Sequence, residues 1–177
     1  MKKSKLELIS LGKPLESKST QNGVIKLLLK DHKIMKGLMK KIKSQKSSEQ
    51  KSVDVFNVLK KIVLSHVEAE EKSLLNIIKE NSKFEDMALE GKEEHKIHED
   101  VIHKIDKTKN LKIKVVRIKI FCEFLKHHLE EEETDLFPKF KKYSADSTRK
   151  KLGQIFVNKR TKTQSLNETK RVLTALN

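Results

Sequence analysis

Cysteine, proline and glycine are all scarce in this chain of 177 residues, which has one cysteine, two prolines and five glycines. A single cysteine excludes an internal disulfide and any zinc ribbon or redox pair made of cysteines, so a bound metal would need nitrogen and oxygen ligands. Two prolines and five glycines are too few for the turns of an all-β sandwich of this length. The sequence therefore predicts one domain with a helical fold.

Long apolar runs are also missing. No segment approaches the roughly 18 apolar residues that a membrane-spanning helix needs. The basic N-terminal stretch lacks the apolar core of about 7 to 15 residues that a secretory signal contains. We therefore expect a cytoplasmic protein with no membrane partner.

Arginine and tryptophan are rare, although the chain is strongly basic. With 40 Lys and Arg against 25 Asp and Glu, the formal net charge is +15, a value typical of nucleic-acid-binding proteins. However, only four of these residues are arginines, and the chain has no tryptophan and one tyrosine. The guanidinium groups and stacking rings that recognise nucleic acids are therefore few, and we do not expect a nucleic-acid partner.

Apolar residues recur at helical spacing in four long segments that short polar breaks separate. The segments cover residues 24–43, 53–79, 87–107 and 111–137. Pro138 is expected to end or kink the last one, because proline removes a backbone hydrogen bond. Four helices of about 20 residues with short links predict an all-α fold, an antiparallel up-down four-helix bundle over residues 23–143.

The two ends of the chain lie outside this pattern and carry much of the charge. Residues 1–22 are predicted to form an N-terminal arm, and residues 144–177 a basic C-terminal segment that could include one short helix. Residues 144–177 contribute +6 of the net charge, from eight basic and two acidic residues. This segment could bind an acidic partner.

Two motifs occur twice at nearly the same offset. DHKI at Asp31–Ile34 recurs as EHKI at Glu94–Ile97, 63 residues later, and SHVEAEEKSLL from Ser65 recurs as HHLEEEETDLF from His127, 62 residues later. The chain is therefore predicted to consist of two similar helical hairpins. Each hairpin offers one histidine from its first helix and a His-x-x-x-Glu pair from its second.

Three candidate metal ligands lie on the apolar face in each half. They are His32, His66 and Glu70 in the first half, and His95, His128 and Glu132 in the second. Residues four apart lie above one another on a helix, so each His-x-x-x-Glu pair directs a nitrogen and an oxygen into the same volume. Burying four imidazoles and two carboxylates without a cation would be costly. This donor set favours iron, with manganese or zinc as substitutes, and three ligands per half suit two ions that the carboxylates could bridge.

Three other histidines lie close to these candidates in the sequence. His98 could be a further ligand or could hold a ligand in place, and a partly exposed position is an equal alternative. His103 lies off the apolar stripe and is predicted to be a surface residue. His127 is rotated by about 100° from His128, so we expect it to face outward.

The ordered series DHKI, HVEAEEKSLL, EEHKI and HHLEEEETDLFP resembles the hemerythrin superfamily, specifically the HHE cation-binding domains, over about residues 24–143. The resemblance implies a four-helix bundle with a non-haem di-iron centre that binds oxygen reversibly, or that senses oxygen, nitric oxide or iron. It also implies that the six candidate residues above are the metal ligands.

The chain departs from the oxygen-carrying hemerythrins at two positions. Glu99 replaces their second histidine on the third helix, with His98 one residue earlier, and Glu133 replaces their aspartate on the fourth helix. His98, Glu99 and Glu133 are therefore candidates for additional ligands or for partners of ligands. One fewer histidine and an additional carboxylate would stabilise ferric iron and disfavour reversible oxygenation.

The leading hypothesis is a di-iron protein that binds or senses O2 or another small diatomic ligand such as NO, or that handles iron. We predict no catalytic nucleophile, because Cys122 and the serines have no activating partner in the sequence. One alternative is a redox enzyme that acts on peroxide or nitric oxide, with Glu70 and Glu132 as bridging carboxylates. The other is a helical protein that binds nucleic acid through its basic C-terminal segment.

Overall fold

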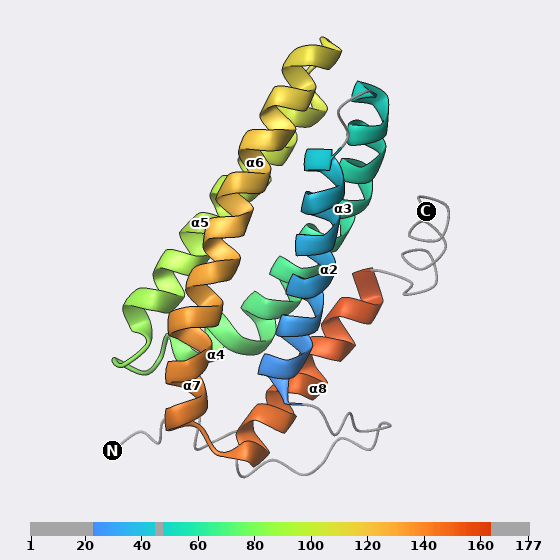
Figure 1. Ribbon diagram of the computed structural model, residues 1–177. Coiled ribbons are helices and arrows are strands. Elements are labelled where there is room, and N and C mark those ends of the chain that lie inside the picture. The colour runs from blue at the N-terminus through green and yellow to red at the C-terminus, as the bar shows by residue number, and fades with distance from the viewer. Residues whose placement is uncertain (1–22, 45–47, 164–177) are drawn as a thin grey trace.

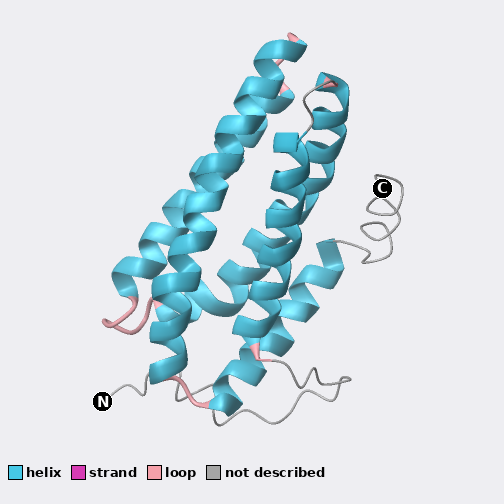
Figure 2. Cartoon of the chain, viewed as in Figure 1, coloured by secondary structure: helices cyan, strands magenta, loops and turns pink. Residues whose placement is uncertain are grey.

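The computed structural model describes residues 23–44 and 48–163, with the side chains of residues 161–163 left out of the description. Every regular element in these ranges is helical (Figure 2). The predicted N-terminal arm, residues 1–22, lies outside the described residues. Within the described part, no helix is both long enough and apolar enough to cross a membrane.

Four of the long helices lie side by side (Figure 1). They are α2 (Val24–Ser44), α3 (Glu49–Glu70), α5 (Glu85–Asp106) and α6 (Leu111–Glu131). The chain of α3 continues through a π turn, η1 (Glu71–Leu75), into α4 (Asn76–Ile78), and the chain of α6 continues through a second π turn, η2 (Glu132–Leu136), into α7 (Phe137–Tyr143). A further long helix, α8 (Asp146–Thr163), completes the described chain.

Side-chain caps determine where α3 and α6 begin. The side chain of Ser48 accepts a hydrogen bond from the Lys51 N–H at 3.3 Å, and that of Asn110 accepts one from the Ile113 N–H at 3.1 Å. Such caps satisfy N–H groups that have no partner inside the helix. Because the first turn of α3 is mostly polar, apolar spacing had placed its start at residue 53, four residues too late.

Pro138 does not end the last long helical segment, which continues to Tyr143. The proline lies in the first turn of α7, immediately after η2. The change from π to α hydrogen-bond spacing at this point accommodates the missing N–H.

Two apolar clusters fill the interior, and a polar layer separates them. One cluster includes Met35 and Phe121, and the other includes Leu28 and Phe140. His32 follows Leu28 by one turn on α2 and precedes Met35, so it lies between the two clusters. The apolar clusters thus enclose the layer from both ends of the bundle, where polar atoms have little access to water.

Helix α8 is longer than the short helix that the sequence pattern suggested, at 18 residues. It packs against α2, α3 and η1, and it lies across one end of α2 and α3 (Figure 1). Leu152 and Phe156 are 0% and 2% exposed and belong to the second apolar cluster. This helix is therefore part of the core.

Candidate metal centre

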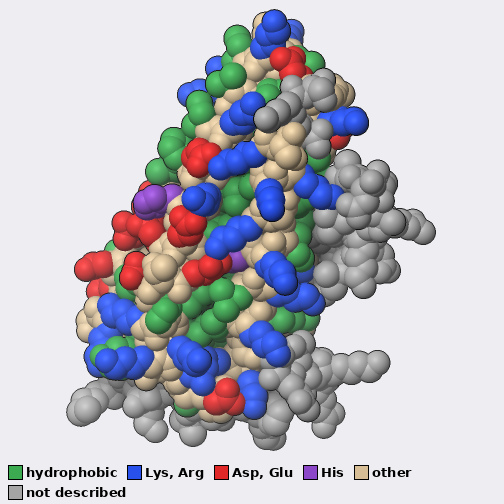
Figure 3. Space-filling model, in the orientation of Figure 1, with side chains coloured by type: hydrophobic (Ala, Val, Ile, Leu, Met, Phe, Trp, Pro, Cys, Tyr) green, Lys and Arg blue, Asp and Glu red, His purple; other side chains and the backbone are tan. Residues whose placement is uncertain are grey.

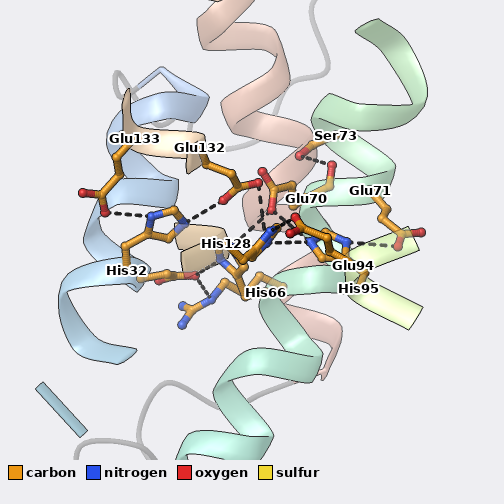
Figure 4. Close-up of polar contacts among 12 residues, drawn as sticks. His32, His66, Glu70, Glu71, Ser73, Glu94, His95, His128, Glu132 and Glu133 are labelled. Atoms are coloured by element: carbon orange, nitrogen blue, oxygen red, sulfur yellow. Dashed lines mark hydrogen bonds and ion pairs between the residues drawn. The ribbon is translucent and has the colours of Figure 1, made fainter. Parts of the chain in front are cut away.

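The six side chains predicted as metal ligands meet in the polar layer (Figure 4). They are His32 from α2, His66 and Glu70 from α3, His95 from α5, His128 from α6, and Glu132 from the start of η2. Each of these residues is at most 4% exposed. Four different helices therefore supply buried imidazoles or carboxylates to a single volume.

These side chains form two groups in which the potential ligand atoms lie within 4.8 Å of one another. One group contains Glu70, His95, His128 and Glu132, and the other contains His32, His66 and Glu132. Glu132 belongs to both. Glu70 also lies between the groups, since its Oε2 is 3.3 Å from His66 Nε2 and 3.8 Å from His95 Nε2. Both carboxylates therefore lie between the histidines of the two halves.

The carboxylates face histidine nitrogens at the centre. Oε2 of Glu132 is 3.3 Å from His32 Nε2, and Oε1 is 3.8 Å from His128 Nε2. Among the described residues, none of the oxygens of Glu70 and Glu132 has a hydrogen-bond partner of good geometry. Buried carboxylates without such partners carry a large desolvation cost, which a bound cation would remove.

Each of the four histidines directs its other ring nitrogen, Nδ1, toward a carboxylate on the outside of the centre (Figure 4). These pairs join His32 to Glu133 at 3.0 Å, His66 to Asp31 at 3.3 Å, His95 to Glu71 at 3.1 Å, and His128 to Glu94 at 2.7 Å. Because an ionised carboxylate can only accept, Nδ1 donates, and in the neutral form of each ring the lone pair is then on Nε2. The outer carboxylates therefore select the tautomer that a metal requires.

The outer carboxylates follow the internal repeat. Asp31 and Glu94 occupy equivalent positions, and each accepts from a histidine of its own half. Glu71 and Glu133 are also equivalent, and each accepts from a histidine of the opposite half. The repeat therefore relates the candidate ligands and also the carboxylates that pair with their Nδ1 atoms.

Sequence reasoning identified only part of this outer set. Glu133 was predicted as an additional ligand or a ligand partner, and its contact with His32 Nδ1 is that of a partner. The roles of Asp31, Glu71 and Glu94 were missed. The repeat contained the signal, because an acidic residue precedes the histidine in both DHKI and EHKI, and a Glu-Glu pair closes both His-x-x-x-Glu motifs.

The two remaining candidates on α5 lie outside both groups of ligand atoms. His98 is 3% exposed, and its ring centroid is 5.1 Å from that of His128 and 5.7 Å from that of Phe121. It therefore packs beside the centre, which contradicts the alternative of a partly exposed position. Glu99 is exposed, because one further residue on a helix turns the side chain away by about 100°. The structure does not bring Glu99 to the centre.

Both halves have a π turn beside the carboxylate ligand. Glu70 directly precedes η1, and Glu132 is the first residue of η2. In the first half, the Ser73 hydroxyl donates to the backbone carbonyl of Glu70 at 3.4 Å. A π turn changes the helical phase locally, and such turns are frequent at functional sites.

Burial and neighbouring charges shift the pKa values of these groups in opposite directions. Burial, with the proximity of His66, lowers the pKa of His32 to about 4. Burial also opposes protonation of His66, but the hydrogen bond to Asp31 and the close Glu70 carboxylate outweigh it and raise the His66 pKa to about 10. For Glu132, burial and the nearby Glu70 carboxylate raise the pKa well above its usual value. Without metal, His66 is therefore protonated at neutral pH, and Glu132 binds a proton more readily than an ordinary carboxylate; a bound cation would compete with both protons.

Helix α8 covers one side of the centre. Arg160 Nε lies 2.7 Å from Asp31 Oδ2, and the Phe156 ring centroid is 6.0 Å from that of His66. Glu94, the counterpart of Asp31, has no such cover and is partly exposed. The two sides of the centre therefore differ in access to solvent.

The family model of the hemerythrin HHE cation-binding domain matches residues 23–140. No curated protein and no solved structure is significantly similar to the chain. The matched range includes the four long helices that supply the buried histidines and carboxylates, and it ends before α8. Because the match covers well over half of the 177 residues, the chain belongs to the hemerythrin family of HHE cation-binding domains.

Proposed function

We propose that the buried centre holds two iron ions and that the protein uses them to bind or sense a small diatomic ligand such as O2 or nitric oxide. The convergence of four histidines on Glu70 and Glu132, whose oxygens have no hydrogen-bond partner among the described residues, supports this proposal most strongly. Mixed imidazole and carboxylate ligands suit iron, and manganese or zinc could substitute for it.

The residues divide naturally between two ions. One ion would be held by His32 and His66, and the other by His95 and His128, with Glu70 and Glu132 shared between them. Two imidazoles and two shared carboxylates per ion leave coordination positions free for a small ligand. Bound iron would supply the redox and ligand-binding chemistry, while the chain supplies the donors and fixes their tautomers.

The surroundings favour a small, weakly polar ligand. Met35, Val63 and Leu125 each lie about one turn from a proposed ligand and are at most 2% exposed. Such walls exclude bulk water and leave little room for a larger substrate. Because the centre is rich in carboxylates, we propose that it stabilises ferric iron and serves sensing or iron handling better than reversible oxygen transport.

We further propose the antiparallel up-down arrangement of the four long helices, a cytoplasmic location, and an acidic partner for the basic C-terminal segment. The short links that join α2 to α3 and α5 to α6 support the antiparallel arrangement. Arg160 is already paired with Asp31, so an acidic partner would have to use other basic residues of residues 144–177.

Metal analysis tests the proposal directly. Protein purified without an affinity tag and loaded with Fe²⁺ without oxygen is expected to hold about two ions per chain. The variant His66→Ala/His128→Ala removes one nitrogen ligand from each proposed position and is expected to lose most of the metal. His103→Ala, at an exposed position on α5, is the control and should retain it. Full metal retention in the double variant would overturn the assignment.

Optical spectra distinguish ligand binding from the enzymatic alternative. Reduced, iron-loaded protein should change its visible spectrum on exposure to O2 or nitric oxide and then remain stable. Rapid, repeated consumption of peroxide or nitric oxide without a stable spectral change would favour the redox enzyme instead.

A further inference from the structure

A further group of potential metal ligands, separate from the two groups of the buried centre, lies at the surface beside that centre. It consists of Glu94 from α5 and of His127 and Glu131 from α6, whose ligand atoms lie within 4.8 Å of one another. Nδ1 of His127 is 3.1 Å from Glu131 Oε2, and the His127 side chain is 71% exposed. We call Glu94, His127 and Glu131 the surface triad. One imidazole and two carboxylates are ligands that divalent transition metals accept.

A cavity of about 80 Å³ lies between part of this triad and the buried residue Glu132. Glu94 and Glu131 of the surface triad line it, together with the buried ligand Glu132. Glu90 and Asp135 contribute two more carboxylates to its wall. Acidic side chains gather on this face over one end of α5 and α6 (Figure 3). The cavity is large enough to hold water.

The buried carboxyl group of Glu132 lies at the inner side of the cavity. Glu132 is 4% exposed, and both of its oxygens are without a hydrogen-bond partner among the described residues. By contrast, two other surface hollows are lined mainly by basic residues, such as Lys36, Lys40 and Lys43 in one of them. On a chain of net charge +15, the acidic cavity is therefore a favourable place for a cation to approach.

The equivalent side of the first half is closed. By the repeat, His127 and Glu131 correspond to Ser65 and Ala69, and both of these small residues are 0% exposed. Ala69 lies in the same apolar cluster as Phe156 of α8. The Asp31 carboxylate, equivalent to Glu94, is paired with Arg160. Of these equivalent positions, the ones in the first half are covered by α8. The ones in the second half are not covered, and they carry exposed side chains that could bind a metal.

From these observations we infer that the surface triad is an entry site for a divalent transition-metal ion, and that the acidic cavity passes the ion to Glu132. Glu94 connects the two sites, because its Oε2 accepts from the ligand His128 while its other oxygen is left for the arriving ion. This inference rests on the proposed function, because it takes the buried centre as the place where the ion finally binds.

The rate of Co²⁺ uptake tests this entry role. Metal-free protein is mixed with Co²⁺ in a stopped-flow instrument, and the visible absorption of the bound ion is followed. In His127→Ala/Glu131→Gln, uptake at low ionic strength is expected to slow by about fivefold or more, within the range that electrostatic steering provides. The number of ions held at equilibrium should equal that of the unaltered chain.

A matched variant controls for the loss of an exposed histidine and an exposed carboxylate. His103→Ala/Glu130→Gln makes the same two changes outside the surface triad, at exposed residues of α5 and α6. This control should load at the rate of the unaltered chain. Equal rates in all three proteins would overturn the entry role. If the triad variant instead held fewer ions at equilibrium, its residues would belong to the final site, which would also overturn it.

A direct binding measurement does not depend on the buried centre. Mn²⁺ added to the full chain should broaden the proton NMR signals of the His127 ring at lower concentrations than those of His103, which is also exposed. Equal broadening of the two rings would overturn the surface site. If the unaltered chain took up no Co²⁺ at all, the proposed function would fail. If it took up Co²⁺ normally but the rates were equal, the entry site alone would fail.

Discussion

At the level of single residues, the outer carboxylates determine which nitrogen each histidine can offer. Glu133 is one of the three partly exposed carboxylates among the four that accept from Nδ1, with its side chain 27% exposed, and it also pairs with Lys36 at 2.7 Å. A neutral histidine has only one ring proton, so an acceptor at Nδ1 keeps Nε2 free. Binding strength at the centre should therefore depend on residues that never touch the metal.

Replacing Glu133 by alanine should weaken metal binding without removing a ligand. His32 would lose the acceptor that holds its ring and its tautomer, and we expect the affinity to fall about 10-fold to 100-fold. Competition with a coloured chelator for Co²⁺ measures this change. Glu130→Ala, an exposed position on the same helical segment, should leave the affinity unaltered. An equal loss of metal affinity in both variants would contradict this prediction, because the affinity would then depend on the total negative charge and not on the contact with His32.

Metal uptake should release protons, and the affinity should rise with pH. The pKa of His66, raised to about 10, means that this imidazole is protonated at pH 7 in the metal-free chain. A metal ligand must be neutral, so binding expels the proton, and the expulsion costs less as the pH approaches 10. Glu132, whose pKa is also raised, contributes in the same direction. Titration calorimetry in two buffers with different heats of ionisation measures the release, and identical heats would contradict it.

Some residues of the centre could be predicted from the sequence, and others could not. His32, His66 and His128 could be placed at the centre because helical spacing puts them on apolar faces. Glu99 became a candidate because it stands in place of the second histidine that oxygen-carrying hemerythrins have on this helix, but it is exposed. The pairing of Asp31 with Arg160 could not be predicted, because it depends on how two distant helices pack. Metal binding by the six ligands stays a prediction.

At the level of helices, the all-helical fold and the family were predicted from spacing and motifs, and both are confirmed. The two π turns were not predicted, because hydrogen-bond spacing within a helix leaves little trace in composition. Helix α8 was underestimated, because its few apolar residues are spread among many polar ones. Its place in the core depends on the surfaces of α2, α3 and η1, which exist only in the folded chain.

The packing of α8 gives a stability prediction. Phe156→Ala should lower the free energy of unfolding by about 3–5 kcal/mol, because a buried ring is removed and a cavity remains. Thermal or urea unfolding of the metal-free protein measures the change. Phe124→Ala is the matched control, and since Phe124 is 50% exposed on α6, it should cost about 1 kcal/mol or less. An equal loss of unfolding free energy in the two variants would mean that α8 adds little to the core.

At the level of the whole molecule, the bound ions would join the two halves. Glu132 of the second half belongs to the same ligand group as His32 and His66 of the first. Metal binding should therefore stabilise the entire bundle, because the unfolded chain has no preformed site. At a free metal concentration 100 times the dissociation constant, the gain is about 2.7 kcal/mol.

Thermal unfolding with and without Co²⁺ measures this gain. The unaltered chain should unfold at a higher temperature with the metal, and removal of the metal by a chelator should reverse the shift. His66→Ala/His128→Ala should show little shift, since it lacks a nitrogen ligand at each position. A similar shift in both proteins would place the stabilising ions elsewhere on the surface.

The position of α8 would also make the two proposed ions unequal. Near His66, the Arg160 guanidinium brings a positive charge to Asp31, whereas the cavity on the opposite side brings carboxylates toward Glu132. Two ions in a symmetric cage would be interchangeable, but here one position lies beside a cation and the other beside a cluster of anions. The centre should consequently fill in order, with the position of His95 and His128 occupied first and the position beneath α8 second.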